Sequence, residues 1–285
     1  MTDAPQVLSF PRAEKRRRRP RGEAARYVEF AVASNFSFLR GASHPEELML
    51  QADHLRLDGL GLCDRNSVAG VVRAYLIRRE KKLPLRYHAG VRLVFADGTP
   101  DILAYPRDRP AWGRLCRLLT QGNLRAEKGD CILSLDDLIA WAEGLEIIVM
   151  PECTRDAPAK PLHKSRSFFG EKPRLLKANE AELEIAPILQ RLHAAAPGHV
   201  RLAATMLYRG NDRTRIATRA KLAQEADVPL IAVNDVLYHH HDRRALQDVL
   251  TCIREHVTID KAGRKLAANA ERYLKSADEM ARLFS

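Results

Sequence analysis

The chain has 285 residues, of which 46% are hydrophobic and 29% are charged, a composition typical of a globular protein with a buried core. No apolar run approaches the ~20 residues of a membrane span, and the N-terminus lacks an apolar signal segment, which argues against a membrane or secreted protein. The cysteines are widely spaced and form no CxxC pair, which favours free thiols in a reducing cytoplasm: Cys63, Cys116, Cys131, Cys153 and Cys252.

Basic side chains are concentrated near the N-terminus. The net charge is +11, and residues 12–21, with seven Lys or Arg against one Glu, contribute +6 of it. A like-charge run flanked by Pro11 and Pro20 predicts disorder, so we interpret residues 1–26 as a disordered basic arm. Two roles stay open for the arm: a solubilising tail, or a DNA-binding segment that neutralises phosphates through Arg12, Lys15, Arg16, Arg17, Arg18, Arg19 and Arg21.

From residue 27 onward, short apolar runs alternate with helical patterns. The runs are rich in Val, Ile and Leu and mostly lack the alternation of a half-exposed strand. They therefore predict strands buried on both faces of a parallel sheet. In chain order the runs cover residues 27–34, 59–64, 87–95, 101–105, 146–151, 200–207 and 230–235.

Capping signals place several helix starts. Ser43 with Glu46 predicts a capping box that opens a helix over 45–57, and Ser134 with Asp137 predicts a second. A third box, at 276–279, starts a helix close to the last residue of the sequence. Because so short a helix is marginal alone, we expect the sequence to be part of a longer protein.

Strands that alternate with helices predict right-handed βαβ units. Five or six such units without a GxGxxG turn favour a closed or distorted barrel over a dinucleotide-binding sheet. Residues 154–180 contain three prolines and no clear periodicity, so we interpret them as an irregular insertion. In a parallel barrel, functional side chains lie at the carboxyl ends of the strands.

The residues at those ends belong to longer distinctive stretches: YVEFAVASNFSFLRGASHPEEL, GLGLCDRNSVAGVVRAY, GVRLVFADG, and PLIAVNDVLYHH with RRALQDVLTCIREH. Together they resemble the PHP (polymerase and histidinol phosphatase) domain of the bacterial C-family error-prone DNA polymerases. The resemblance covers residues 27–285 apart from the irregular insertion. It implies an α/β fold, namely a PHP-type distorted (β/α)7 barrel over 27–255, with 256–285 starting a linker toward a polymerase palm.

The resemblance also implies where metal ligands would lie. Active PHP domains hold two or three ions through His-x-His on the first strand, Asp-His on the second, Glu on the third and Asp-x-His on the last. The corresponding residues here are, in order, Ala31, Ala33, Asp64, Arg65, Arg92, Asp235 and Leu237. Of these, Asp64 and Asp235 alone keep a ligand side chain.

Residue chemistry predicts that this vestigial pocket is metal-free. A water-activating cluster needs several imidazoles and carboxylates together, and Ala31 and Ala33 offer no donor atom. Arg65 and Arg92 would put permanent cations where the ions would lie. We predict that these arginines pair with Asp64 and Asp235, which would otherwise be costly buried acids. The sequence thus predicts no catalytic residue, metal ligand or cofactor in this chain.

Three alternatives stay open. An active PHP-type phosphoesterase or nuclease would use the reduced set Asp64, Asp235 and His239. A metal could bind His239, His240 and His241 with Asp242, although successive side chains at a strand end point to opposite faces, so at most two histidines would converge. The chain could also be a nucleic-acid-binding module that acts through its basic arm.

The resemblance implies a structural scaffold within an error-prone, translesion DNA polymerase that serves DNA damage repair and DNA replication. Nucleotidyl transfer and its Mg²⁺ would belong to a palm outside this sequence, so we expect the segment to be inactive alone. The expected partners are DNA, the palm and thumb of the same parent chain, and other translesion-synthesis proteins, with no membrane. The expected location is the cytoplasm.

Overall fold

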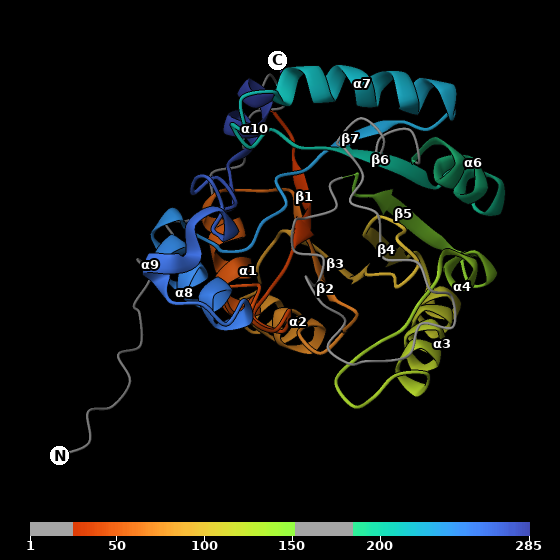
Figure 1. Ribbon diagram of the computed structural model, residues 1–285, viewed down its shortest axis with the longest axis horizontal. Helices are drawn as coiled ribbons and strands as arrows, with labels where there is room; N and C mark the ends of the chain where they lie inside the picture. The colour runs from red at the N-terminus through yellow and green to blue at the C-terminus, as the bar shows by residue number, and fades with distance from the viewer. Residues whose placement is uncertain (1–24, 152–184) are drawn as a thin grey trace.

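One sheet of seven strands runs through residues 25–151 and 185–285, the part of the chain that the computed structural model describes. The strands lie side by side in chain order: β1 (Val28–Val32), β2 (Gly59–Arg65), β3 (Arg86–Leu93), β4 (Ile102–Pro106), β5 (Leu145–Val149), β6 (Val200–Ala204) and β7 (Leu230–Ala232). Figure 1 shows the sheet curled around the centre of the molecule, with helices outside it. Every predicted apolar run overlaps one of these strands, so the strand prediction is confirmed apart from shifts of a few residues at the ends.

Most neighbouring strands are parallel, as predicted, but β4 is not. The β1–β2–β3 and β5–β6–β7 groups are each parallel, whereas β4 pairs antiparallel with both β3 and β5. The connection from β3 to β4, residues 94–101, is shorter than the dozen or more residues that a parallel crossover needs, so the chain reverses direction. The parallel prediction is therefore wrong for this one strand.

The sheet curls until its first strand meets the segment that follows its last strand. The Ala33 N–H donates to the Val236 carbonyl at 3.0 Å, and the Val236 N–H donates to the Ala31 carbonyl at 2.7 Å. Asp235 allows this approach by adopting a φ of 50°, a left-handed conformation that Asp tolerates better than most side chains. This seam closes a distorted α/β barrel, which confirms the predicted fold class.

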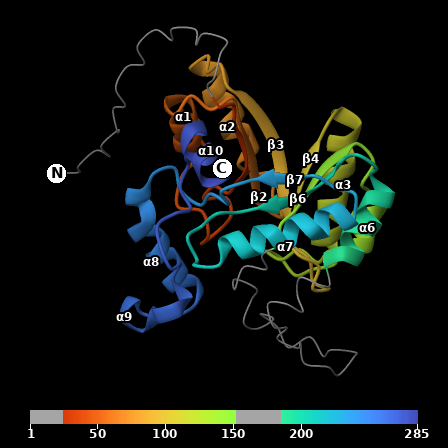
Figure 2. The same cartoon turned by 90° about the horizontal axis from the view of Figure 1, so that it is seen from above.

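Helices cover the outside of the barrel. Figure 2 shows α1 and α2 on one side of β3, and α3 and α6 on the other side, beyond β4. The helices are α1 (Pro45–His54), α2 (Val71–Glu80), α3 (Arg109–Leu124), α4 (Leu135–Ala140), α6 (Ile185–Ala195), α7 (Asp212–Glu225), α8 (Arg244–Arg254), α9 (Ile259–Ala262) and α10 (Ala277–Leu283), with 3₁₀ turns η1 (His241–Arg243) and η2 (Gly263–Lys265).

Of the three predicted capping boxes, the one at Ser134 is complete, and the one at Ser276 keeps only its N-cap hydrogen bond. The Ser134 hydroxyl accepts the Asp137 N–H before α4, and the Ser276 hydroxyl accepts the Glu279 N–H before α10. The box predicted at Ser43 is displaced by one residue: His44 is the N-cap of α1, and its N–H donates to the Glu47 carboxylate at 2.8 Å. Ser43 is unavailable because its hydroxyl bonds to the ring of His239.

The barrel interior is packed rather than open. Two apolar cores lie between the sheet and its helices, and a third core of strand residues fills the interior. Tyr105 on β4 crosses that interior closely over Gly90 on β3, where an added Cβ would lie 2.3 Å from the tyrosine ring. Any functional pocket must therefore lie at an end of the barrel.

Two predicted segments fall outside the described residues. These are the basic arm, apart from its last two residues, and the irregular insertion at 154–180. Within the described residues, none of the helices combines the length and apolarity that crossing a membrane requires.

Candidate functional site

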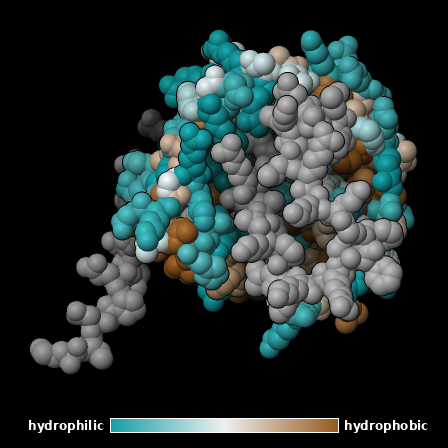
Figure 3. All heavy atoms as spheres, in the orientation of Figure 1, coloured by the Kyte–Doolittle hydropathy of each residue, from teal (hydrophilic) through white to brown (hydrophobic). Residues whose placement is uncertain are grey.

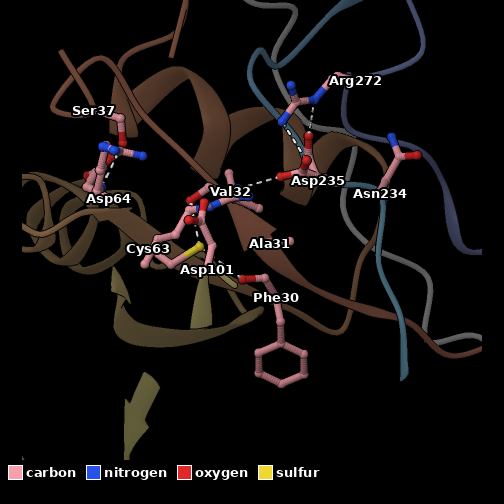
Figure 4. Close-up of polar contacts among 12 residues, drawn as sticks. Phe30, Ala31, Val32, Ser37, Cys63, Asp64, Asp101, Asn234, Asp235 and Arg272 are labelled. Atoms are coloured by element: carbon pink, nitrogen blue, oxygen red, sulfur yellow. Dashed lines mark hydrogen bonds and ion pairs between the residues drawn. The ribbon is translucent and has the colours of Figure 1, made fainter. Parts of the chain in front are cut away.

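An arginine–aspartate cluster lies where the parallel strands end. Arg92 on β3 donates from Nη1 to Asp235 Oδ1 at 2.6 Å and from Nε to Asp101 Oδ2 at 2.7 Å. Arg272 donates from Nη2 to the second oxygen of Asp235 at 2.6 Å and from Nε to the Asp235 carbonyl at 2.8 Å. Figure 4 shows Arg272 directed at Asp235. The predicted contact between Arg92 and Asp235 is present.

The cluster holds its charges although it is buried. The side chains of Asp235, Arg92 and Arg272 are 4%, 9% and 10% exposed. Burial alone would raise the pKa of Asp235, but Arg272 and Arg92 outweigh it and lower that pKa to about 2. Burial also opposes the charge of Arg92, and Asp235 and Asp101 overcome it, so the pKa of Arg92 rises. Asp235 and Arg92 therefore stay ionised.

Asp64, at the end of β2, lies in a separate polar pocket. Its Oδ1 accepts the Ser34 N–H at 2.8 Å and the Ser37 hydroxyl at 2.7 Å, and its Oδ2 accepts the Ser34 hydroxyl at 2.8 Å. Gly70 leaves room for this carboxylate, because a Cβ there would lie 2.6 Å from Oδ2. Burial raises the pKa of Asp64, and the serine hydrogen bonds offset only part of that rise.

Serines supply the hydrogen bonds that Asp64 accepts in the described part of the chain, whereas we predicted an arginine beside it. Within the described residues, Arg92 turns away to Asp235 and Asp101. Arg65 ends β2 half-buried, and its backbone N–H donates to the Ser37 hydroxyl at 3.0 Å. Asp64 therefore accepts three hydrogen bonds from Ser34 and Ser37 in the loop after β1.

The positions without donor atoms are filled by apolar packing. Ala31 belongs to the interior core together with Cys63. Ala33 and Leu237 share a small buried cluster with Tyr238. Burial raises the pKa of the Cys63 thiol to about 12, so the thiol stays neutral. None of these four positions therefore offers an ionised or imidazole ligand.

Sequence reasoning missed two members of the cluster. Asp101 precedes β4, and because β4 is antiparallel, its amino end lies where the parallel strands have their carboxyl ends. Inspecting both ends of every strand would have found it. Arg272 comes from the segment that we assigned to a linker, which packs back on the barrel through its carbonyl and the Leu237 N–H at 2.9 Å. No local signal marks Arg272.

The reduced ligand set Asp64, Asp235 and His239 does not come together. His239 is buried, with Nδ1 2.8 Å from the Ser43 hydroxyl and 4.0 Å from Glu47 Oε2, so its ring faces α1. Figure 4 shows Asp64 with Ser37 on one side of the view and Asp235 with Arg272 on the other, with Val32 and Cys63 between them. An ion at Asp235 would also need the two oxygens that arginines occupy.

The residues present therefore do not fit a two- or three-ion cluster. Such a site needs several neutral imidazoles and free carboxylates around one point. This pocket offers two alanines, a leucine, a guanidinium and an aspartate whose oxygens are both bonded. No catalytic step through a metal follows from it.

The curled seven-stranded sheet closes into a distorted α/β barrel, and the strand-end positions at which the resemblance implies metal ligands carry alanine, leucine and arginine beside two aspartates. The sequence places the chain more closely. It is 50% identical over 265 residues to the error-prone DNA polymerase of Rhodopseudomonas palustris strain BisB5, a match that covers 90% of this chain and 21% of that polymerase. The chain is thus a homologue of one segment of the error-prone DNA polymerases, as the resemblance implied.

Other relatives agree. The error-prone DNA polymerase of Sinorhizobium medicae strain WSM419 is 47% identical over 264 residues, covering 93% of this chain and 21% of its own length. The chain therefore spans about a fifth of these relatives. It matches no family model.

Two solved structures show a weaker likeness. One is a candidate metal-dependent phosphoesterase from Bifidobacterium adolescentis, at 15% identity and a TM-score of 0.48 over 74% of this chain and 88% of that chain. The other is an amidohydrolase from Chromobacterium violaceum with bound sulfate and no metal, at 15% identity and a TM-score of 0.46 over 74% and 87%. Likenesses of this size carry no conclusion about function.

Proposed function

We propose that this chain is a metal-free, PHP-like structural segment of an error-prone DNA polymerase. The observation that supports the proposal best is the Arg92 guanidinium, which bonds to Asp235 and Asp101 at a position that the resemblance assigns to a metal ligand. The polymerase activity belongs to the parts of such an enzyme that this chain does not span. The segment provides a rigid body on which those parts are held.

The cluster supports a scaffold role because it joins distant parts of the chain. Arg92 lies on β3, Asp101 precedes β4, Asp235 follows β7, and Arg272 lies near the C-terminus. Four segments are thus fixed by one buried network of charge-assisted hydrogen bonds, which are stronger and more directional than neutral ones. A cluster of this kind can hold the barrel in shape without a metal.

Helix α8 supplies a surface for contact with the rest of the polymerase. Its buried side chains are Gln247, Thr251 and Cys252, whereas the larger Leu246, Val249 and Ile253 are 40%, 49% and 53% exposed. Residues spaced by three and four lie on one helix face, so the apolar stripe of α8 points outward, the reverse of an ordinary surface helix. Figure 3 shows apolar surface on the side of the molecule where Figure 1 places α8 and α9.

The occupant that we propose for this stripe is the remaining part of the polymerase. The relatives extend about fourfold beyond the matched segment, so most of each polymerase lies outside it. In that setting the segment takes part in translesion synthesis and damage repair in the cytoplasm. Its partners there are DNA, the palm and thumb of the same polymerase, and other translesion proteins. Mg²⁺ and nucleotidyl transfer belong to the palm.

A chimera tests the proposal. The matching segment of the Rhodopseudomonas palustris polymerase is replaced by this chain, and primer extension and thermal unfolding are measured. We expect the chimera to extend primers, and we expect Val249→Asp with Ile253→Asp to weaken both extension and thermal stability. The same two substitutions should leave the unfolding of the isolated chain nearly unchanged, because both side chains are already half-exposed there.

Leu124→Asp is the matched control, since Leu124 is an apolar residue that is 82% exposed at the end of α3, away from the stripe. It should leave the chimera unaffected. The proposal fails if a polymerase lacking the whole segment extends primers as well as the chimera does, or if the α8 substitutions act no more strongly than Leu124→Asp.

A further inference from the structure

Two histidines and one aspartate meet on the surface where the barrel seam leads into α8. His240 Nδ1 lies 3.1 Å from Asp242 Oδ2, and His241 Nε2 lies 3.1 Å from Asp242 Oδ1. The three ligand atoms are all within 4.8 Å of one another. The side chains are 41%, 59% and 76% exposed, so solvent and ions reach them freely.

Neighbouring charges leave this group free to bind an ion. Arg243 directs its guanidinium to the Glu47 carboxylate, and Arg244 bonds to Asp248 at 2.7 Å and to a backbone carbonyl at 2.6 Å. Because both of these arginines bond to other groups, the ion-pair contacts described for Asp242 are those with the rings of His240 and His241. His239 faces inward to Ser43, so two of the three histidines converge, within the expected limit of two; they are the adjacent His240 and His241, which lie at the 3₁₀ turn η1 and not along a strand.

We propose that the turn formed by His240, His241 and Asp242, here named the histidine turn, binds one divalent transition-metal ion such as Zn²⁺. Two imidazole nitrogens and one carboxylate oxygen suit zinc, copper and nickel better than calcium or magnesium. Ligand atoms on a tetrahedral zinc lie about 3.4 Å apart, given metal–ligand distances of about 2.1 Å. Each imidazole nitrogen lies 3.1 Å from a different oxygen of Asp242, slightly closer than this spacing, so the three groups are near enough to share one ion whose coordination water completes.

This site is separate from the arginine-filled pocket and does not depend on the proposed scaffold role. A bound ion would join His240, at the end of the segment that follows β7, to η1, the 3₁₀ turn that leads directly into α8. An ion that restrains this turn would also restrain the first residues of α8, the helix that carries the outward apolar stripe. The histidine turn is therefore a place where metal availability can act on the proposed docking helix.

Titration of the full chain with Zn²⁺, followed by calorimetry, tests the site. We expect saturable binding of one equivalent, and at least tenfold weaker binding by His240→Ala and by His241→Ala, since even outer partners of metal ligands contribute tenfold or more. Co²⁺ supplies a second readout, because its visible absorption reports the ligand set directly. The side chains are exposed, so circular dichroism should show the variants folded.

His54→Ala is the control, because His54 is an exposed histidine on α1 outside the turn. It should leave the affinity and the Co²⁺ spectrum unchanged. The site is disproved if the chain shows no saturable binding by about 1 mM Zn²⁺. It is also disproved if the double variant His240→Ala with His241→Ala binds as tightly as the original chain, since the ion would then lie elsewhere.

Discussion

Arg92 is bonded through two nitrogens to carboxylates from two different segments, and its remaining nitrogen, Nη2, is buried without a hydrogen-bond partner. A buried guanidinium of this kind is stable only while its acids are present. Asp235 depends on its arginines in the same way, because without them it would be a buried anion with no compensating charge. The pair is therefore sensitive to the loss of either member.

This sensitivity gives a prediction at the residue scale. We expect Arg92→Ala to lower the free energy of unfolding by roughly 3–5 kcal/mol, because it leaves Asp235 and Asp101 underpaired in the interior. A double-mutant cycle between Arg92→Ala and Asp235→Asn, measured by urea unfolding, should show coupling well above ~0.5 kcal/mol. Asn also tolerates the left-handed backbone at position 235.

The exposed pair Arg73–Glu46, with side chains 58% and 32% exposed, is the matched control. Its coupling should fall within about 0–1 kcal/mol. If Arg92→Ala does not fold, Arg92→Met keeps the apolar stem and allows the same cycle. Coupling between Arg92 and Asp235 no larger than that of the exposed pair would mean that the pocket is held by packing alone.

The closing seam is the weakest part of the sheet at the scale of elements. Between β1 and the segment after β7, a bridge at Val32 and Val236 replaces a full ladder. Glu29 compensates on the β1 side: one carboxylate oxygen accepts the Ala31 N–H at 2.8 Å, and the other accepts the Asn234 N–H at 2.8 Å. A side chain thus connects the two edges of the barrel.

Glu29 makes the seam sensitive to pH. Burial raises the pKa of Glu29 to about 7, although three hydrogen bonds, including one from the Tyr27 hydroxyl, oppose the rise. An unfolded glutamate has a pKa of about 4.3, so the folded chain binds this proton more tightly than the unfolded chain does. Stability from this group is therefore full at low pH and is lost as pH rises from about 4 through 7.

We expect the contribution of Glu29 to fall by on the order of 3 kcal/mol across that range. Glu29→Gln cannot titrate, so the difference in unfolding free energy between the original chain and the variant should change with pH by this amount. Urea unfolding at several pH values between 4.5 and 8 measures it. Glu143→Gln, whose side chain is 85% exposed, is the control, and equal pH profiles for Glu29→Gln and the original chain would contradict the prediction.

Charge is distributed unevenly over the whole molecule. Residues 12–21 contribute +6 to the net charge of +11, so the remainder carries +5. If the seven basic side chains of the arm contact single-stranded DNA, each should contribute about −0.7 to the slope of log K against log salt concentration, or about −5 in total. We expect deletion of residues 1–24 to remove most of this slope, as measured by fluorescence anisotropy.

A variant with the seven basic residues replaced by glutamine keeps the length of the arm and separates charge from chain length. It should behave like the deletion. Affinity and slope that survive both changes would place DNA binding on the barrel and would leave the arm as a solubilising tail.

The sequence predicted the strands closely because a strand that is buried on both faces is encoded by a short unbroken apolar run, such as the one in β2. The sequence also predicted that Asp64 and Asp235 lie near strand ends, because the resemblance assigns both residues to such positions. It misplaced the cap of α1, because the Ser43 hydroxyl could serve either that helix or His239, and only packing decides between them.

What the sequence determined by itself was which residues stand at the strand ends where the resemblance implies metal ligands: two alanines, a leucine, two arginines and two aspartates. What only the tertiary structure decided was which charges meet. Arg92 reaches Asp101 because β4 turns back antiparallel. Arg92 and Arg272 reach Asp235 from positions 143 and 37 residues away in the chain. Such contacts depend on strand direction and on the path of the chain in space, and local residue patterns encode neither.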